Sequence, residues 1–359
     1  MNAKILSFCA IITIELLAAG SIFAKDEFRP GEVWLDTSNN PVQAHGGGIL
    51  LHSNIFYWYG EDRTPRGRGA VACYSSANLY DWKREGVALS GADLPRVDGR
   101  RTFVERPKVI FNPRTKKFVM WMHLEQNGYC FSRAGIATSD SPAGPFKFLQ
   151  AIRPIGNTND FASLSNDPER EKDYGGTFRD MNVSMDDDGK AYAFYSSEGN
   201  WTMYVVRLDN EFTGPELPAI ENKNWAKILV RRMREGPAPF KWKGKYYLIT
   251  SACTGWAPNA ADYAVADKIL GPYQSHGNPC VGENYEKTFD SQSTFVLAMP
   301  DHPDSFIFMA DHWNPRNLSD SRHIWLPFTM EANGKFRIPW RGHWNVSIFM
   351  AAGNKSNLL

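Results

Sequence analysis

Five polar side chains stand at equivalent places in the sequence, each at the entry to a short apolar run. They are His45, Glu105, Asp180, Glu235 and Gln292. If the five runs meet in space, three carboxylates, one imidazole and one amide surround a single pocket. Carboxylates that lie close together repel each other, which raises the pKa of at least one of them. An enzyme that needs a carboxylic acid protonated near neutral pH uses such a raised pKa.

Each of these residues alone also has an ordinary structural interpretation. Glu105 precedes Arg106 and Asp180 follows Arg179, so either carboxylate could form a simple ion pair. His45, in an Ala-His-Gly-Gly-Gly segment, could be a hydrogen-bonded core histidine or a carbohydrate contact. The combination at five equivalent positions, rather than any single residue, favours a catalytic site.

The elements that position these residues repeat along the chain. Five aromatic-rich runs read as strands, each preceded and followed by another apolar strand; they cover residues 54–59, 117–122, 189–195, 244–249 and 304–309. Five units of about four strands predict an all-β fold, a single five-bladed β-propeller. The structural alternative, a two-sheet sandwich, does not predict five similar units. In a propeller the first strand of each blade lies nearest the axis, so the five entry residues converge.

Composition limits the function classes. The 359 residues carry a formal net charge of +1, so no global field gathers nucleic acid or an anionic membrane surface. Residues 1–24 resemble a cleavable export signal, with Lys4, an apolar run and small residues at its end. We therefore expect a secreted or periplasmic protein without membrane insertion, in which residues 25–359 form the propeller.

Cysteine and metal patterns are uninformative. The mature chain keeps Cys73, Cys130, Cys253 and Cys280, which could be buried free thiols or disulfides. There is no Cys-x-x-Cys pair and no His/Cys cluster with zinc spacing. We expect no cofactor and no metal. The polar stretch 157–176 is predicted to be a surface insertion, placed at a pocket mouth.

At the residues named above the chain resembles glycoside hydrolase family 43, the five-bladed propeller glycosidases, and within it the exo-β-1,3-galactanase branch. The resemblance runs from about Trp34 to Trp344. It is carried by the segments 43–49 (Gln-Ala-His-Gly-Gly-Gly-Ile), 57–61, 105–108 (Glu-Arg-Pro-Lys), 179–182, 187–190, 235–238 (Glu-Gly-Pro-Ala), 254–256 (Thr-Gly-Trp) and 291–293.

The resemblance implies catalytic roles. Glu235 matches the general acid, and Asp180 matches the carboxylate that tunes the pKa of that acid and holds the sugar. The family's usual base, an Asp at the start of the first inner strand, is absent here, where the chain reads Ala-His45-Gly. In the galactanase branch a Gln and a Glu are implicated instead, and they match Gln292 and Glu105. Glu105 is the better base on charge alone, whereas Gln292 could orient a water or accept a proton only as an unusual tautomer.

Further residues are expected to bind the substrate: His45, Glu61, Tyr129, Thr254 and Trp256. Trp201, Trp313 and Trp344 are assigned to the core or the rim. The implied function is inverting hydrolysis that releases terminal galactose from β-1,3-galactan, as in arabinogalactan. Two alternatives stay open, namely an arabinofuranosidase or galactofuranosidase of the same family, and a catalytically silent carbohydrate-binding propeller.

Overall fold

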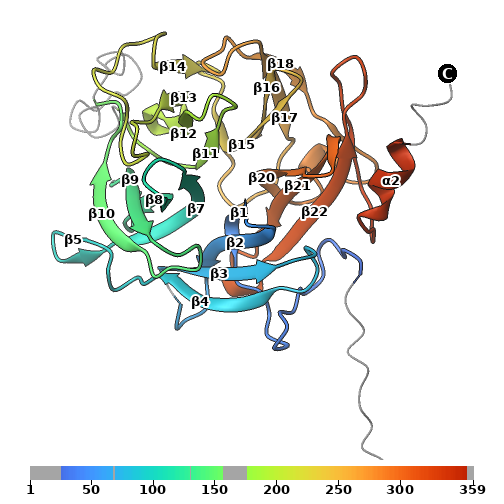
Figure 1. Cartoon of the computed structure of the whole chain (residues 1–359), viewed down its shortest axis with the longest axis horizontal. Coiled ribbons are helices and arrows are strands. Elements are labelled where there is room, and N and C mark those ends of the chain that lie inside the picture. The colour runs from blue at the N-terminus through green and yellow to red at the C-terminus, as the bar shows by residue number, and fades with distance from the viewer. Residues whose placement is uncertain (1–25, 68, 130, 157–175, 354–359) are drawn as a thin grey trace, which may run out of the picture.

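Antiparallel sheets surround a central axis in the computed structural model, which describes residues 26–67, 69–129, 131–156 and 176–353 (Figure 1). Four sheets have four strands each; the fifth has three in the described part of the chain. The blades consist of β1 (His45–His52), β2 (Ile55–Asp62), β3 (Ala70–Ser76) and β4 (Lys83–Leu89); β7 (Phe103–Asn112), β8 (Lys117–Glu125), β9 (Arg133–Ser139) and β10 (Lys147–Ile152); β11 (Met181–Met185), β12 (Ala191–Ser197), β13 (Thr202–Arg207) and β14 (Trp225–Ile228); β15 (Arg234–Trp242), β16 (Lys245–Ala252), β17 (Asp262–Ala266) and β18 (Gln274–Gly277); and β20 (Gln292–Met299), β21 (His302–His312) and β22 (Arg322–Thr329). The predicted five-bladed, all-β propeller is confirmed.

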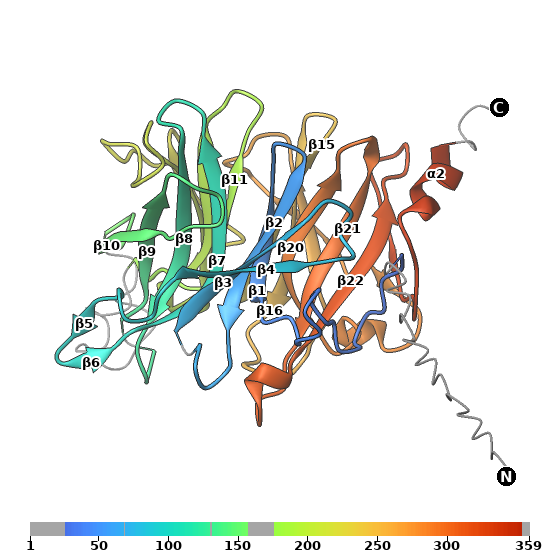
Figure 2. The same ribbon diagram turned by 60° about the horizontal axis from the view of Figure 1, so that its bottom comes forward.

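The first strand of each blade is the innermost. Strands β1, β7, β11, β15 and β20 contact one another in a ring around the axis. Figure 1 shows them at the centre of the fold, and Figure 2 shows the same strands after a turn of 60°. The five predicted entry residues therefore lie at the starts of adjacent strands. Asp180 directly precedes β11, and the other four lie within the first three residues of their strands.

A bulge follows three of these entry residues. After His45, Glu105 and Glu235 two residues of the inner strand oppose one residue of the second strand. The first residue of each bulge is left-handed: Gly46 at φ 57°, Arg106 at φ 55° and Gly236 at φ 60°. Glycine tolerates this conformation, but a left-handed arginine is strained and persists only where its surroundings hold it. The bulges therefore orient side chains at the mouth of the axis.

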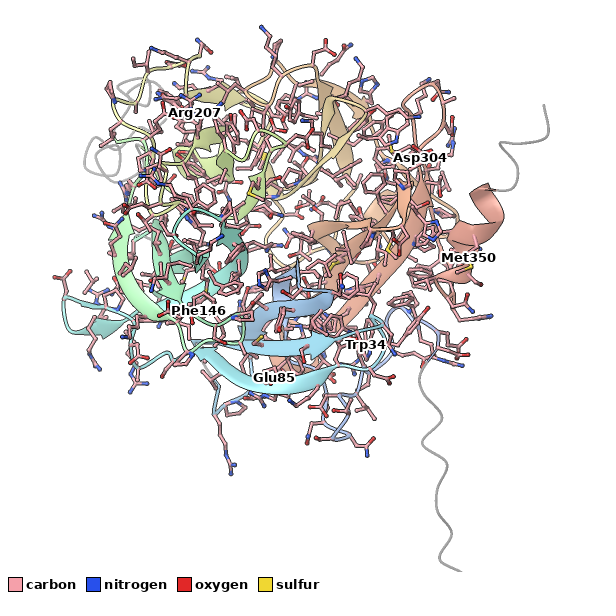
Figure 3. The ribbon with its side chains drawn as sticks, viewed as in Figure 1. Trp34, Glu85, Phe146, Arg207, Asp304 and Met350 are labelled. Carbon is pink, nitrogen blue, oxygen red and sulfur yellow. The ribbon has the colours of Figure 1, made fainter. Side chains whose placement is uncertain are left out.

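Side chains fill the spaces between blades (Figure 3), and those that form the core are apolar and aromatic. The described residues form five core clusters, each shared by two neighbouring blades. Because both faces of a blade are covered, β8 and β12 are almost entirely buried and lack the alternation of a half-exposed strand. One cluster gathers Trp34, Trp58, Trp82, Trp325 and Trp344. Many of the aromatic side chains therefore pack between neighbouring blades.

The two ends of the described chain meet at the junction of the first and last blades. Phe28 pairs with Trp344 through two backbone hydrogen bonds of 2.7 and 3.1 Å. The remaining elements are short: β5 (Arg96–Val97), β6 (Arg100–Arg101), β19 (Cys280–Val281), β23 (Ile338–Pro339), α2 (Ser347–Gly353) and the 3-10 turns Glu198–Asn200, Tyr285–Lys287 and Leu318–Asp320. Within the described ranges no helix has the length and apolar character to cross a membrane. The expected leader and nearly all of the 157–176 insertion lie outside the described residues.

Candidate active site

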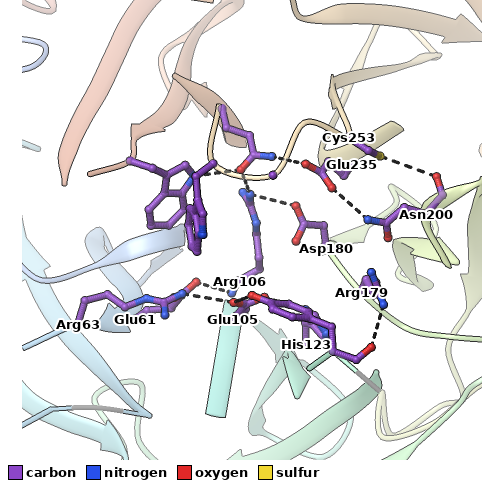
Figure 4. Close-up of a pocket in the computed structure, with 15 residues that line it drawn as sticks. Glu61, Arg63, Glu105, Arg106, His123, Arg179, Asp180, Asn200, Glu235 and Cys253 are labelled. Atoms are coloured by element: carbon purple, nitrogen blue, oxygen red, sulfur yellow. Dashed lines mark hydrogen bonds and ion pairs between the residues drawn. The ribbon is translucent and has the colours of Figure 1, made fainter. Parts of the chain in front are cut away.

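The inner strands surround a cavity of about 280 Å³ at the end where they begin (Figure 4). Its walls come from every blade: Glu61, Arg63, Glu105, Arg106, His123, Tyr129, Arg179, Asp180, Asn200, Glu235, Cys253, Gly255, Trp256, Gln292 and Trp313. Seven of the nine residues predicted for the site are among them. The structure therefore brings Glu61, Glu105, Tyr129, Asp180, Glu235, Trp256 and Gln292 together.

Glu235 is a buried carboxyl group held by two amides. Gln292 Nε2 donates to its Oε1 at 2.8 Å, and Asn200 Nδ2 donates to its Oε2 at 3.1 Å. Burial, followed by the charge of Asp180, raises the pKa of Glu235 to about 8. At neutral pH this group therefore holds a proton that it can donate.

Asp180 faces Glu235 and is fixed by two donors. Arg106 Nη2 lies 3.0 Å from its Oδ2, and the backbone N–H of Gly236 donates to the same oxygen at 3.1 Å. Because Gly236 follows the acid directly in the β15 bulge, this bond couples the position of Asp180 to that of Glu235. Any side chain at position 236 would collide with the carbonyl of Ser293, 2.8 Å from an added Cβ.

Gln292 uses its whole hydrogen-bonding capacity within the protein. Its Oε1 accepts from Arg106 Nη2 and from Trp313 Nε1 at 3.0 Å, and its Nε2 donates to Glu235 and to Ser251 Oγ at 3.0 Å. Arginine and tryptophan side chains can only donate, which fixes the orientation of the amide. An imidic acid tautomer would turn a hydroxyl hydrogen toward two donors. In this arrangement Gln292 is an anchor for the acid and poorly suited to take a proton from water.

Cationic and hydroxyl partners surround Glu105 on the opposite wall. Tyr129 Oη donates to its Oε1 at 2.7 Å, His123 Nδ1 forms an ion pair with its Oε2 at 3.2 Å, and Arg63 lies 3.6 Å away. Burial alone would raise the pKa of Glu105, but pairing with His123, aided by Arg63 and Tyr129, lowers it to about 2. Glu61 lies beside it, held by Arg63 and by the backbone N–H of Arg106 at 2.9 Å.

Aromatic rings line two sides of the cavity. Trp313 packs edge-on against Trp256 with ring centroids 5.3 Å apart, and Trp256 is 40% exposed. Tyr129, 38% exposed, lies on the Glu105 side beneath the guanidinium of Arg179. Flat, partly exposed rings beside carboxylates can bind the apolar faces and the hydroxyls of a sugar ring.

Two predicted substrate-binding residues do not line the cavity. His45 is fully buried: its ring stacks on that of His323 at 4.9 Å, and its Nδ1 lies 3.7 Å from Asp311. Blade 1 instead presents Glu61, the residue paired with His45 across the sheet. Thr254 is exposed, and its hydroxyl bonds to Ala257 and Asn259 within its own loop.

Sequence reasoning missed several lining residues, chiefly Arg106, His123, Asn200 and Trp313. Arg106 occupies the left-handed bulge position that is glycine in blades 1 and 4, so alignment of the blade entries could have revealed it. His123 is the β8 residue paired with Glu105, and pairing each entry residue with its partner strand would have found it. Asn200 and Trp313 lie beyond second-strand ends, where no regular spacing predicts them.

Among the residues that the structure describes, two groups of side chains bring metal-binding atoms within 4.8 Å of one another: His45, Asp311 and His323, and Glu105, His123 and Asp180. In the first group the rings stack with only 16° between their planes, so their in-plane lone pairs do not converge on one point. In the second group both nitrogens of His123 lie within 3.2 Å of carboxylate oxygens, an arrangement that suits a charged ring. Both groups fit buried polar networks better than metal centres.

Cys73, Cys253 and Cys280 are free thiols, and Cys130 lies outside the described residues. Cys253 lines the cavity, and its thiol lies 3.9 Å from the carbonyl oxygen of Asn200. Burial raises its pKa well above the usual range for a thiol. The thiol is therefore not activated as a nucleophile.

A propeller whose axis ends in a cavity with a buried carboxylic acid, an arginine-paired carboxylate and aromatic walls has the features of a glycoside hydrolase. Comparison with known proteins identifies the glycoside hydrolase family to which the chain belongs. A sequence profile described as "Glycosyl hydrolases family 43" matches residues 40–336. The chain therefore belongs to glycoside hydrolase family 43 and is a glycosidase.

Among solved structures, the chain is similar to β-1,3-galactosidases and exo-β-1,3-galactanases of this family. The β-1,3-galactosidase BT3683, solved with galactodeoxynojirimycin, is 40% identical with a TM-score of 0.78, covering 89% of this chain and 100% of that one. The exo-β-1,3-galactanase of Phanerochaete chrysosporium, in complex with β-1,3-galactotriose, is 30% identical (TM-score 0.75; 90% of this chain, 68% of that one). That of Clostridium thermocellum is 32% identical (TM-score 0.75; 88% and 66%). A search of curated protein sequences found no match.

Proposed function

We propose that this glycosidase releases terminal galactose from β-1,3-galactan with inversion. The observation that carries the proposal is the environment of Glu235, a buried carboxyl group held by Gln292 and Asn200 beside Asp180. Similarity to β-1,3-galactosidases and exo-β-1,3-galactanases supports the choice of sugar and linkage. A cavity of about 280 Å³, at the small end of ligand pockets, suits a single terminal residue and thus exo-cleavage.

In this proposal Glu235 protonates the glycosidic oxygen as the bond breaks. Asp180 keeps that proton on Glu235 in the resting enzyme, because a second negative charge beside it would be repelled. Glu105 is the carboxylate assigned to the water side, since it is ionised and faces the cavity. Inversion requires the acid and the water-activating group to be about 6.5–9.5 Å apart, with a water between them.

The direct test offers the purified protein β-1,3-galactan, an aryl β-galactoside and an aryl α-L-arabinofuranoside, with the Glu235→Gln variant as the matched control. We expect free galactose from the galactan, the α-anomer first by NMR, and no arabinose. Early β-anomer would contradict inversion. Arabinose as the main product, or equal galactan turnover by wild type and variant, would contradict the proposed substrate or the acid.

We also propose that residues 1–24 direct export and are then removed. The support is the sequence pattern of a short apolar run followed by small residues. Sequencing the amino terminus of protein from the native host tests this. A terminus near Lys25 in a secreted or periplasmic fraction is expected, and a cytoplasmic chain that keeps Met1 would contradict it.

A further inference from the structure

Behind Glu105 lies a row of ionisable side chains that the catalytic scheme above does not use. His123 and Glu125 are on β8, two residues apart, and therefore on the same face of that strand. His123 Nδ1 lies 3.2 Å from Glu105 Oε2, and its Nε2 lies 3.1 Å from Glu125 Oε2. His123 is 1% exposed and Glu125 is fully buried. A buried imidazole thus bridges the site carboxylate to a second carboxylate deeper in the blade.

Glu125 also closes the loop that follows β8. Its carboxylate accepts from the backbone N–H groups of Gln126 at 2.9 Å and Phe131 at 2.7 Å. It further accepts from the N–H of Ser132 at 3.0 Å and from its hydroxyl at 2.7 Å. A carboxylate with this many donors is fixed in position and strongly favours its charged form.

The same loop carries Tyr129, whose hydroxyl returns to Glu105 at 2.7 Å. The contacts thus form a closed circuit from Glu105 through His123 and Glu125, along the loop to Tyr129, and back to Glu105. Removing the Glu125 carboxylate would leave His123 with one anionic partner and would remove the hydrogen bonds that hold the loop of Tyr129. Glu125 does not line the cavity, but it contacts His123 and the loop of Tyr129, and both His123 and Tyr129 line it.

The charges in the circuit support one another. His123 Nε2 is hydrogen-bonded to Glu125 and Nδ1 lies 3.2 Å from Glu105, so a doubly protonated ring places its positive charge between two carboxylates. Burial would lower the pKa of His123, but pairing with Glu105 and Glu125 raises it to about 9. The other charged or titratable groups around this end are Tyr129, Arg63 at 3.6 Å from Glu105, Glu61 beside Arg63, Asp180 within 4.8 Å of Glu105 and His123, and Arg179 over the ring of Tyr129.

We propose that His123 and Glu125 are positioning residues of this active site, which hold Glu105 in its ionised form and Tyr129 against the bound sugar. The inference rests on the proposed glycosidase cavity, but neither the sugar nor its linkage enters the argument. It predicts that the charge of Glu125, as well as its shape, matters for turnover.

Glu125→Gln and Glu125→Asp separate charge from shape, with Glu85→Gln on the outer strand β4 as the control for the same chemical change. Using the best substrate found for the wild type, Glu125→Gln should lower kcat/KM by about tenfold to a hundredfold, the cost of a hydrogen bond to a charged group. The ring of His123, followed by ¹⁵N NMR, should also lose its proton at lower pH than in the wild type, because it loses an anionic partner. Glu125→Asp should keep the wild-type titration of His123, and Glu85→Gln should keep both the wild-type kcat/KM and the wild-type titration of His123. A His123 titration that stays in place in folded Glu125→Gln would overturn the proposal.

A second measurement needs neither substrate nor a stable variant. The ring of His123, assigned by its loss in His123→Asn spectra or by direct assignment, is titrated by ¹⁵N NMR in the wild type. We expect a doubly protonated ring at pH 7.5. A neutral ring at that pH would overturn the proposal even if the proposed galactan activity holds. A charged ring in an enzyme without galactan activity would contradict the substrate alone.

Discussion

Glu235 and Glu105 lie on opposite walls of one cavity, and both are buried, yet their pKa values move in opposite directions. Glu235 is held by neutral amides and faces another carboxylate, so burial raises its pKa to about 8. Glu105 faces an imidazolium, a guanidinium and a phenol, which outweigh burial and lower its pKa to about 2. Burial by itself does not decide the charge of an acidic group; its partners do. Groups with pKa values driven apart in this way are suited to distinct acid and acceptor roles.

The largest expected effect comes from replacing the proposed general acid, Glu235. Glu235→Gln should lower turnover of a natural galactan linkage by about 10²–10⁴-fold, because the leaving oxygen is no longer protonated. An aryl substrate with a very good leaving group should keep most of its rate, since that oxygen departs without help. Steady-state rates on the two substrates measure the contrast. Equal losses on both would place the acid elsewhere.

The next largest effects are expected at Glu105 and Gln292, the two residues that could activate the water. Glu105→Gln should slow both substrates alike, by about a hundredfold or more, because water attack is needed whatever group leaves. Gln292→Ala should also slow both, since it removes a hydrogen bond from Glu235 and leaves the N–H groups of Arg106 and Trp313 without their acceptor.

Added azide distinguishes the two variants, because a small anion needs no base. We expect azide to restore Glu105→Gln and to leave Gln292→Ala slow. Rescue of Gln292→Ala alone would assign water activation to the amide and contradict its role as an anchor.

The pH dependence tests how Asp180 acts on Glu235. Activity requires protonated Glu235, so kcat/KM should fall as the pH rises through about 8. Asp180→Asn removes the neighbouring negative charge and frees Arg106, both of which favour ionised Glu235. The basic limb should therefore move to lower pH, together with a loss of rate. A limb that moves upward or stays in place would show that Asp180 does not raise the pKa of the acid.

The smallest effects compare two residues of the same loop. Trp256→Ala should raise KM by about twofold to tenfold, the value of one aromatic contact. Thr254→Val should change KM by less than about twofold, because its hydroxyl bonds within its own loop. Measurements on galactan oligosaccharides decide between them. A larger increase in KM for Thr254→Val than for Trp256→Ala would contradict the view that Trp256, and not Thr254, contacts the sugar.

The sequence was sufficient to predict the five blades and the residues at the start of their inner strands. Repeated aromatic strands predicted five units, and propeller geometry then predicted that Glu105, Asp180, Glu235 and Gln292 converge. It was not sufficient for side chains whose direction depends on a bulge or on cross-strand register. Arg106 points to the axis because its backbone is left-handed, which strand periodicity does not encode.

Blade 1 illustrates the same limit. The repeat predicts that His45 faces the cavity, as Glu105 and Glu235 do in their blades. Its ring instead stacks on His323 and lies beside Asp311, both from the last blade, and its cross-strand partner Glu61 faces the cavity. Contacts between the first and last blades join residues more than 260 positions apart, which local sequence patterns cannot reveal.

The opposite charge states of Glu235 and Glu105 can be measured directly by ¹³C NMR titration of the glutamate carboxyl groups, assigned with Glu235→Gln and Glu105→Gln. We expect the Glu235 signal to titrate near pH 8 and the Glu105 signal to stay that of an ionised carboxylate down to about pH 2. If Glu235 ionises near the ordinary glutamate value of about 4.3, or if Glu105 holds a proton at neutral pH, the assignment of acid and acceptor walls is contradicted.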